Sequence, residues 1–253
     1  MRNPTSIVIT GGSSGIGEAL ARFYARPGVD LALTGRDPDR LAGVAARCAA
    51  LGARVRTAQV DVADRGAMAA WLADIDAAAP VDLCVANAGI SAGSGQGTES
   101  EAQARRILQV NVDGVLNTLH PLIPAMRARR RGQLAIVSSL AGFRGFPGAP
   151  AYCASKAAVR IYGEALRGEL WGDGVEVSVV CPGFVESRIT AVNRFPMPFL
   201  MTADRAARII AKGLERGRPR IAFPWPSYAM AWAIGVVPPS WTEMILRALP
   251  RKT

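Results

Sequence analysis

The sequence contains a single histidine, His120, and four cysteines without any CxxC spacing. One histidine excludes zinc sites built on several histidines, and it leaves a Ser-His-acid triad only one candidate base. Each cysteine lies in an apolar stretch that is typical of a core, so we expect free thiols in a reducing compartment and no disulfides. We expect no metal site.

Long apolar runs and lysines are scarce as well. The apolar run at 229–237 ends at two prolines, and it is too short to cross a bilayer core of about 30 Å. A strand pattern begins after six residues and leaves no room for a signal peptide, so we expect a cytoplasmic protein. Only three of the thirty cationic residues are lysines, and Lys156 is one of them. It is of interest because an ammonium shifts a neighbour's pKa as a compact charge, which arginine does not do in the same way.

The chain has 253 residues, half of them hydrophobic and one-fifth charged, which is typical of a single soluble globular domain. Its formal net charge of +10 allows phosphate, anionic lipid or nucleic acid as acidic partners. No nucleic-acid-binding module accompanies this charge, and the arginines within 127–131 suit the C-terminal end of a helix. We therefore expect no nucleic-acid partner.

Short β-branched runs alternate with segments of helical period along most of the chain. We predict strands at 6–10, 30–34, 54–59, 83–86, 133–138, 175–181 and 220–223. We predict helices at 16–26, 38–51, 64–78, 102–126, 152–170 and 202–217. Nearly continuous apolar strands favour an α/β fold, with a doubly wound parallel sheet of about seven strands and helices on both faces. In such a fold, ligands bind at the carboxyl edge of the sheet.

A glycine-rich turn, TGGSSGIG at 10–17, joins the first predicted strand to the first helix. Glycines there permit a tight turn and let a pyrophosphate approach the amides at a helix start. A glycine-rich turn without a ligand is the alternative, but the strand, the spacing and the helix all favour a dinucleotide site. The predicted cofactor-binding residues of this turn are Gly11, Ser13, Ser14, Gly15, Ile16 and Gly17.

At the end of the second predicted strand, Arg36 stands where an NAD site carries an acidic residue that accepts the ribose hydroxyls. A guanidinium there can bind the 2′-phosphate of NADP through paired hydrogen bonds. We therefore predict NADP(H) over NAD, with Arg40 as a weaker helper. The alternative is a solvated surface arginine, because the chain is rich in arginine and Asp37 lies next to this one.

Two more polar segments follow predicted strands at the same edge. Asp61-Val62 ends the third strand, where the carboxylate could hold the adenine amine, and Asn87-Ala88-Gly89 follows the fourth strand. Such residues after a strand are more often caps or turn residues. Because they share an edge with the glycine loop, we predict that they bind the cofactor.

Tyr152 and Lys156 open a predicted helix, and their i to i+4 spacing places the phenol and the ammonium on one face. A nearby cation stabilises phenolate, so we expect Lys156 to lower the pKa of Tyr152 from its ordinary value of about 10. Ser139 follows a strand at the same edge, where its hydroxyl can hydrogen-bond a carbonyl oxygen that gains charge during hydride addition. A packed tyrosine and a solvated lysine are the alternative for a YxxxK pair that stands alone.

Taken together, these motifs resemble the short-chain dehydrogenase/reductase family in its form with a TGxxxGxG loop and a YxxxK pair, over about residues 7–190. The resemblance implies that Tyr152 is the general acid in reduction and the base in oxidation. It also implies that Asn111 holds a water in a proton relay through Lys156. The predicted catalytic residues are Asn111, Ser139, Tyr152 and Lys156, and Tyr152 and Lys156 are predicted to bind the cofactor as well.

The resemblance extends to the nicotinamide end and to the assembly. It implies that Pro182, Gly183, Val185 and Ser187 position the nicotinamide, with Ser187 offering a hydroxyl where threonine is usual. Ala86 stands where a second asparagine is usual, which removes one polar side chain but no reacting group. Homodimers or homotetramers packed through the helices of Asn111 and Tyr152 are implied as well.

We expect one Rossmann-type domain over 1–253, with a substrate lid at 183–203 and an apolar, basic C-terminal extension at 224–253. The lid segment is rich in Phe, Met and Pro, which favours a lipophilic, keto lipid-like substrate; packing of the lid onto the sheet is an equal alternative. From residue 201 on there are nine cationic and three acidic residues and three of the five tryptophans. Peripheral contact with an anionic membrane is a hypothesis for this extension, beside simple packing or a subunit contact.

Two function classes remain in competition. The first is an NADP(H)-dependent carbonyl reductase or alcohol dehydrogenase acting on a small molecule. The second is a catalytically idle NADP-sensing or membrane-surface interaction protein on the same fold. Loss of Tyr152 or Lys156 would favour the second, and both residues are present.

Overall fold

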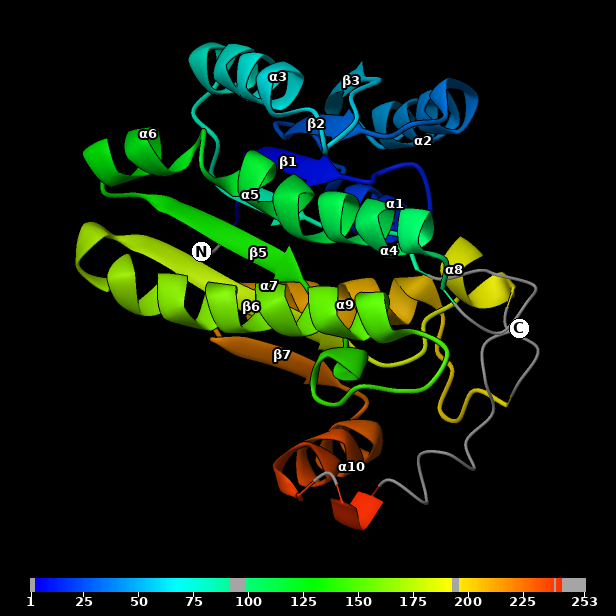
Figure 1. The fold of residues 1–253 in the computed structure, drawn as a ribbon. Helices are drawn as coiled ribbons and strands as arrows, with labels where there is room; N and C mark the ends of the chain where they lie inside the picture. Colours follow the sequence, from blue (N-terminus) through cyan, green and yellow to red (C-terminus); the bar gives the residue numbers. More distant parts are fainter. Residues whose placement is uncertain (1–2, 92–98, 193–195, 239, 243–253) are drawn as a thin grey trace.

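A computed structural model describes residues 3–91, 99–192, 196–238 and 240–242. Its centre is a parallel sheet of seven strands in the order β3-β2-β1-β4-β5-β6-β7 (Figure 1). The strands are β1 (Ser6–Thr10), β2 (Asp30–Thr34), β3 (Arg54–Ala58), β4 (Leu83–Ala86), β5 (Gly132–Val137), β6 (Val175–Pro182) and β7 (Arg220–Phe223). The predicted doubly wound sheet is confirmed, with every predicted strand close to its observed bounds.

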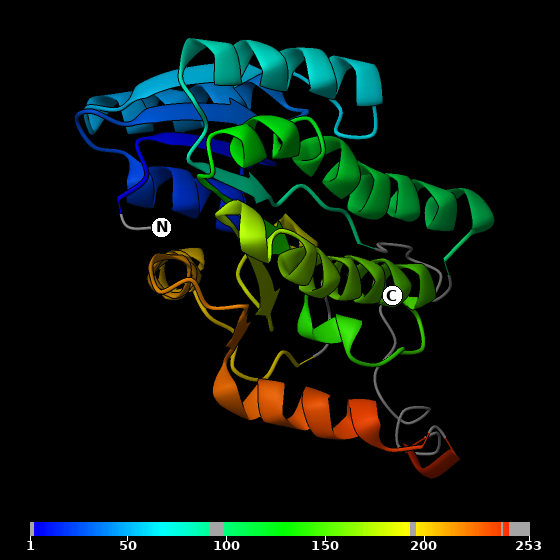
Figure 2. The same cartoon turned by 90° about the vertical axis from the view of Figure 1, so that its left-hand side faces the viewer.

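Helices cover both faces of the sheet, and each face has its own apolar core (Figure 2). One face carries α1 (Gly15–Tyr24), α2 (Pro38–Ala50) and α9 (Ala203–Glu215). The other carries α3 (Arg65–Ala78), α5 (Gly114–Leu119), α6 (Ile123–Ala128) and α7 (Pro150–Glu169). In β1, Ile7 and Ile9 belong to the first core and Val8 to the second, as the two-residue period of a strand requires.

The long helix predicted at 102–126 is wrong as a single element. The chain instead forms α4 (Glu101–Leu108), a π-helical turn (Gln109–Asp113), α5 and α6. At the start of α5, a Cβ on Gly114 would lie 2.6 Å from Val62 Cγ2, so the glycine lets the helix approach the segment after β3 closely. Pro121 follows α5 and cannot continue its hydrogen-bond ladder.

The chain after β6 contains two helices that the sequence pattern does not predict. A short helix, α8 (Arg188–Ala191), lies in the predicted lid, and α10 (Trp225–Val236) follows β7. α10 projects from the β7 edge of the sheet in both views (Figures 1 and 2). Within the described ranges, no helix combines the length and the apolar character needed to cross a membrane. All four cysteines are buried free thiols, as predicted.

Candidate active site

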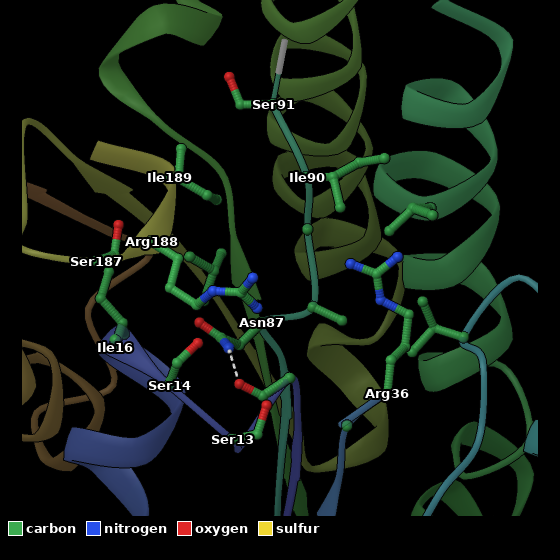
Figure 3. A pocket seen from close by; sticks show the side chains of 18 of the residues that line it. Ser13, Ser14, Ile16, Arg36, Asn87, Ile90, Ser91, Ser187, Arg188 and Ile189 are labelled. Carbon is green, nitrogen blue, oxygen red and sulfur yellow. Dashed lines mark hydrogen bonds between the residues drawn. The ribbon is translucent and has the colours of Figure 1, made fainter. Parts of the chain in front are cut away.

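The strand ends at the carboxyl edge of the sheet border a cavity of about 780 Å³ (Figure 3). A doubly wound sheet places its ligands at this edge. Of the predicted site residues, Gly17 and Asn111 do not line the cavity. Those that do are Gly11, Ser13, Ser14, Gly15, Ile16, Arg36, Arg40, Asp61, Val62, Asn87, Ala88, Gly89, Ser139, Tyr152, Lys156, Pro182, Gly183, Val185 and Ser187.

The glycine loop has the backbone that its spacing predicts. Gly11 and Gly15 have φ values of +64° and +56°, in the left-handed region that favours glycine. Gly17 does not reach the cavity but has no room for a side chain, because a Cβ would lie 2.3 Å from the carbonyl oxygen of Gly11. α1 begins at Gly15, so the loop delivers the start of a helix to the cavity, a site suited to phosphate.

Asn87 ties the glycine loop to the end of β4. Its Nδ2 donates to the carbonyl oxygens of Thr10 at 2.9 Å and Gly11 at 3.1 Å. The buried hydroxyl of Thr10 accepts in turn from the N–H groups of Asn87 and Ala88, both at 3.1 Å. Both amide hydrogens of Asn87 are therefore used inside the protein, and this side chain fixes the shape of the loop.

Arg36 and Arg40 line the cavity but differ in their partners. The guanidinium of Arg40 pairs with the carboxylate of Asp37 at 2.5 Å, and Asp37 also caps α2 by accepting from the N–H of Arg40 at 3.0 Å. Arg36 makes no ion pair with any residue that the structure describes, and Figure 3 shows its side chain directed into the cavity. Of the two, Arg36 is the one available to an anionic ligand.

Asp61 lines the cavity as a carboxylate that already has partners. It accepts from the N–H of Ala63 at 3.0 Å and pairs with Arg106 of α4. Burial raises the pKa of Asp61, but the hydrogen bonds from Ala63 and Arg106 outweigh it and hold the pKa below its ordinary value. Asp61 is therefore ionised and can accept a further N–H, and its contact with adenine stays a prediction.

Ser139, Tyr152 and Lys156 meet in the cavity, although they come from two separate elements. Ser139 follows β5, and its Oγ accepts from the N–H of Ala141 at 3.1 Å and donates to the carbonyl oxygen of Pro182 at 3.5 Å. Tyr152 lies one turn before Lys156 in α7. The Nζ of Lys156 donates to the carbonyl oxygen of Val137 at 2.8 Å and lies 5.9 Å from the centre of the Tyr152 ring. This arrangement places a hydroxyl, a phenol and an ammonium together, as their spacing in the sequence predicts.

The pKa of Tyr152 is raised, not lowered as the sequence argument predicts. Burial disfavours the phenolate, and this outweighs the hydrogen bond from Ser139, which lowers the pKa. Lys156 is only 5% exposed, and burial lowers its own pKa to about 8. A phenol with a raised pKa keeps its proton near neutral pH, and it is a weaker acid than a tyrosine in water.

Asn111 lies in the π-helical turn and is fully buried. Its Nδ2 donates to Ile90 O at 2.9 Å and to Ser155 Oγ at 3.0 Å, and its Oδ1 accepts from the N–H of Ile90 at 2.8 Å. Both amide hydrogens are taken, so a relay water would have to bind to a carbonyl oxygen of this residue. A Cβ on Gly89 would lie 3.3 Å from both Asn111 Oδ1 and Lys156 Nζ, so the two groups share the space beside that glycine.

Glu99 is a site residue that the sequence does not reveal. Its carboxylate accepts from the N–H of Ala151 at 2.6 Å and from the N–H of Tyr152 at 3.4 Å. α7 has no cap from its own N-cap residue, Ala149. Glu99 therefore caps, from 52 positions away, the helix that carries Tyr152 and Lys156. No local pattern could have shown this contact.

Arg188 is a second site residue that the sequence analysis does not predict. Its position next to Ser187, in the motif after β6, is a signal that could have indicated it. It lies in α8 and lines the cavity. Figure 3 shows its guanidinium on the opposite side of the cavity from that of Arg36.

The predicted apolar lid is only partly present at the cavity. Among its described residues, Ile189 and Val192 line the cavity, whereas Phe199 and Leu200 are exposed and Met201 is buried in the core beside Val185. The lid residues at 193–195 lie outside the described part. The lid thus divides its apolar side chains between the cavity, the core and the surface.

Comparisons with known proteins identify the family of the chain. Residues 5–195 match the family model described as short chain dehydrogenase. An uncharacterized oxidoreductase of Myxococcus xanthus is 42% identical over 219 residues, which cover 86% of this chain and 87% of the relative. An uncharacterized oxidoreductase of Mycobacterium tuberculosis is 33% identical over 245 residues, covering 94% of this chain and 95% of the relative. The chain belongs to the short-chain dehydrogenase family of oxidoreductases.

Solved structures show the same architecture. A short-chain dehydrogenase from Sphingobium yanoikuyae in complex with NADPH has a TM-score of 0.81 and 25% identity, and the match covers 98% of this chain and 97% of that one. A 3-oxoacyl-[acyl-carrier protein] reductase with bound NAD from Brucella melitensis has a TM-score of 0.74 and 26% identity, with 86% and 89% covered. The seven-stranded fold is thus that of the family.

Proposed function

We propose that the protein is an NADP(H)-dependent oxidoreductase that interconverts a carbonyl and an alcohol. The observation that carries this proposal is the meeting of Ser139, Tyr152 and Lys156 in the same cavity as the glycine loop. The solved structure in complex with NADPH and the one with bound NAD support a nicotinamide cofactor. When bound, the nicotinamide supplies or accepts the hydride.

Each of the three side chains has a distinct task in the reduction direction. The hydroxyl of Ser139 donates a hydrogen bond to the substrate carbonyl oxygen and stabilises the charge that develops there. Tyr152 transfers its phenolic proton to the same oxygen, which becomes the alcohol. The ammonium of Lys156 stabilises the phenolate that remains, and its pKa of about 8 keeps it charged at neutral pH.

The proposal names NADP(H) because of Arg36. This guanidinium is directed into the cavity and makes no ion pair with the described residues, whereas the guanidinium of Arg40 is already paired with Asp37. A bidentate contact with the 2′-phosphate would satisfy Arg36, and NAD offers only a neutral hydroxyl there. The weaker helper, Arg40, acts in this proposal by holding Asp37 away from the phosphate.

We propose a lipophilic substrate, because Ile189 and Val192 add apolar surface to the cavity. The test is a turnover assay with NADPH and a series of aldehydes and ketones of increasing chain length, followed by the loss of reduced-cofactor absorbance. We expect the specificity constant kcat/KM to rise along the series. Tyr152→Phe should lower it by about 10²- to 10⁴-fold while leaving NADPH affinity unchanged.

The competing function is that of a catalytically idle NADP sensor. It predicts saturable NADPH binding and no turnover with any carbonyl of the series. Turnover that survives unchanged in Tyr152→Phe would contradict the proposed chemistry.

We propose further that α10 lies against an anionic membrane surface. The helix has no charged residue, and Trp225 and Trp232 are 72% and 53% exposed. Exposed tryptophans on an apolar helix suit the boundary between lipid headgroups and acyl chains. The wild type should sediment with vesicles of anionic lipid at physiological salt, and a variant with Trp225→Ser and Trp232→Ser should not. Equal partition of the two proteins would contradict the proposal.

A homo-oligomer is the final part of the proposal. Leu108 of α4 and Ile161 of α7 are large, exposed apolar side chains on helices that pack against each other. Burying them against a second copy would remove this surface from water. Sedimentation should show a dimer or tetramer that Ile161→Glu shifts toward the monomer.

A further inference from the structure

Arg188 is a charged residue of the cavity to which the sequence analysis gives no role. It is the first residue of α8, and it lines the cavity from the segment that follows β6. The residues next to it hold that backbone in place. Ser187 caps α8 and accepts from the N–H of Thr190 at 3.3 Å, and the hydroxyl of Thr190 accepts from the N–H of Ser187 at 2.9 Å. The position of Arg188 is therefore built into the fold.

The same segment lies directly over the glycine loop. A Cβ placed on Gly15 would be 3.1 Å from the Cβ of Ser187, which is an approach that only a glycine at position 15 allows without a shift. Gly15 is the first residue of α1 and has a φ of +56°. The residue after Ser187 thus starts beside the helix start where a dinucleotide places its pyrophosphate.

The charges around the cavity single out two arginines. Arg40 pairs with Asp37, and Arg106 pairs with Asp61, so these guanidiniums have carboxylate partners. Arg36 and Arg188 have no ion-pair partner among the residues that the structure describes, and their guanidiniums lie on opposite sides of the cavity (Figure 3). Two unpaired cations facing one cavity repel each other, and an anion between them removes that repulsion.

Arg188 also acts across the cavity on the β2 side. The pKa of Asp37 is lowered mainly by the hydrogen bond from the N–H of Arg40, and the charge of Arg188 adds to this lowering. The field of Arg188 therefore reaches the residue next to Arg36.

We propose that Arg188 binds the pyrophosphate of the dinucleotide, while Arg36 binds the 2′-phosphate. The inference rests on the proposed dinucleotide-dependent function and deepens it by dividing the two anionic groups of the cofactor between two arginines. Arg36 stands at the end of β2, and Arg188 stands over the glycine loop. NADH keeps the pyrophosphate and lacks the 2′-phosphate, so the two arginines have different effects on the two cofactors.

The test compares Arg188→Gln and Arg36→Gln by fluorescence titration with NADPH and NADH. Arg188→Gln should raise the Kd of both cofactors by the same factor, about 10- to 100-fold, because a charge-assisted hydrogen bond to phosphate is lost in each complex. Arg36→Gln should raise the Kd of NADPH alone. In competition assays, 2′-AMP should lose affinity for Arg36→Gln and keep it for Arg188→Gln.

Arg208→Gln is the matched control, since Arg208 is an exposed arginine of α9 that does not line the cavity. It removes one positive charge and should leave both Kd values unchanged. An Arg188→Gln variant that binds NADPH and NADH like the wild type, or that loses NADPH affinity alone, overturns the assignment while the dinucleotide site stands. A wild type that binds neither cofactor overturns the proposed function itself.

Discussion

The start of α7 and the chain that follows β6 border the same cavity. They differ in whether their polar side chains have partners within the protein. In α7, Lys156 donates to Val137 O at 2.8 Å, its carbonyl oxygen accepts from Ser138 Oγ at 2.7 Å, and Glu99 caps the helix. After β6, Arg188 lines the cavity and has no ion-pair partner among the described residues. Further along the chain, α10 does not line the cavity, and its apolar side chains are largely exposed.

The two regions therefore have different tasks: the start of α7 carries the proton transfer, and the chain after β6 contributes to binding. The proton donor and the ammonium are held by protein atoms alone, so their geometry is in place before a ligand binds. The unpaired arginine and the exposed tryptophans gain their partners only when a ligand, a second copy or a surface arrives. Substitutions in α7 should therefore change the rate constant, and substitutions at the arginines should change affinity.

The largest effect is expected for Lys156→Met. Loss of the ammonium should lower kcat/KM by about 10²- to 10⁴-fold, because the phenolate of Tyr152 is no longer stabilised. The same change should stabilise the fold near neutral pH. Burial of the charged lysine is costly, and methionine removes that cost at the loss of one hydrogen bond to Val137 O, a net gain of about 2 kcal/mol.

The pH dependence of this gain has a definite sign. The pKa of Lys156 falls from 10.5 to about 8 on folding, so the unfolded chain binds more protons between these two values. The cost of burial is complete below pH 8 and disappears as the pH rises toward 10.5. Chemical denaturation should show Lys156→Met to be more stable than the wild type at neutral pH, with the difference shrinking in alkali. A difference that is independent of pH would contradict burial of a charged lysine.

An intermediate effect is expected for Arg36→Asp, which acts on affinity. Reversing the charge should raise the KM for NADPH by about 100-fold, since an attraction to the 2′-phosphate becomes a repulsion, and should change the KM for NADH by less than about threefold. Arg40→Gln is a comparison within the same cavity and should raise the KM for NADPH much less than Arg36→Asp, because the Arg40 guanidinium pairs with Asp37 and acts on the phosphate only through that carboxylate. Equal changes in the KM values for NADPH and NADH in Arg36→Asp would contradict the assignment of NADP(H) as the cofactor.

The smallest effect is expected for Glu99→Ala, which acts on α7 at a distance. Loss of the cap should lower the free energy of unfolding by about 1 kcal/mol and kcat by a few-fold, with cofactor affinity unchanged. Glu99→Gln keeps an oxygen acceptor and should lose less. Glu101→Ala is the matched control, because Glu101 is exposed and, among the described residues, pairs only with the exposed Arg105. A fall in NADPH affinity in Glu99→Ala, or an equal effect in the control, would refute the positioning role.

The parts of the site that the sequence predicts are those defined by short-range spacing. The glycine loop needs its small residues in order along one turn, and Tyr152 and Lys156 need only one helical turn between them. The strands are predicted well because a buried parallel sheet demands continuous apolar runs.

The parts that the sequence misses depend on distant contacts. The helix predicted at 102–126 passes through a π-helical turn where Asn111 bonds Ile90, and it ends at Leu119 before Pro121. Glu99 caps a helix 52 positions away. The raised pKa of Tyr152 follows from burial, which the spacing of two residues does not reveal. α10 is not predicted because its apolar residues lie on every side of the helix. Such a segment shows no amphipathic pattern of helical period.

Equilibrium titration of the wild type with NADPH and with NADH, followed by cofactor fluorescence, tests the central claim most directly. A dinucleotide site whose 2′-phosphate is bound by Arg36 predicts saturable binding of one NADPH per chain, with a Kd at least about tenfold below that of NADH. Absence of binding for both cofactors would contradict a dinucleotide site at this edge of the sheet, and tighter binding of NADH would contradict the role of Arg36.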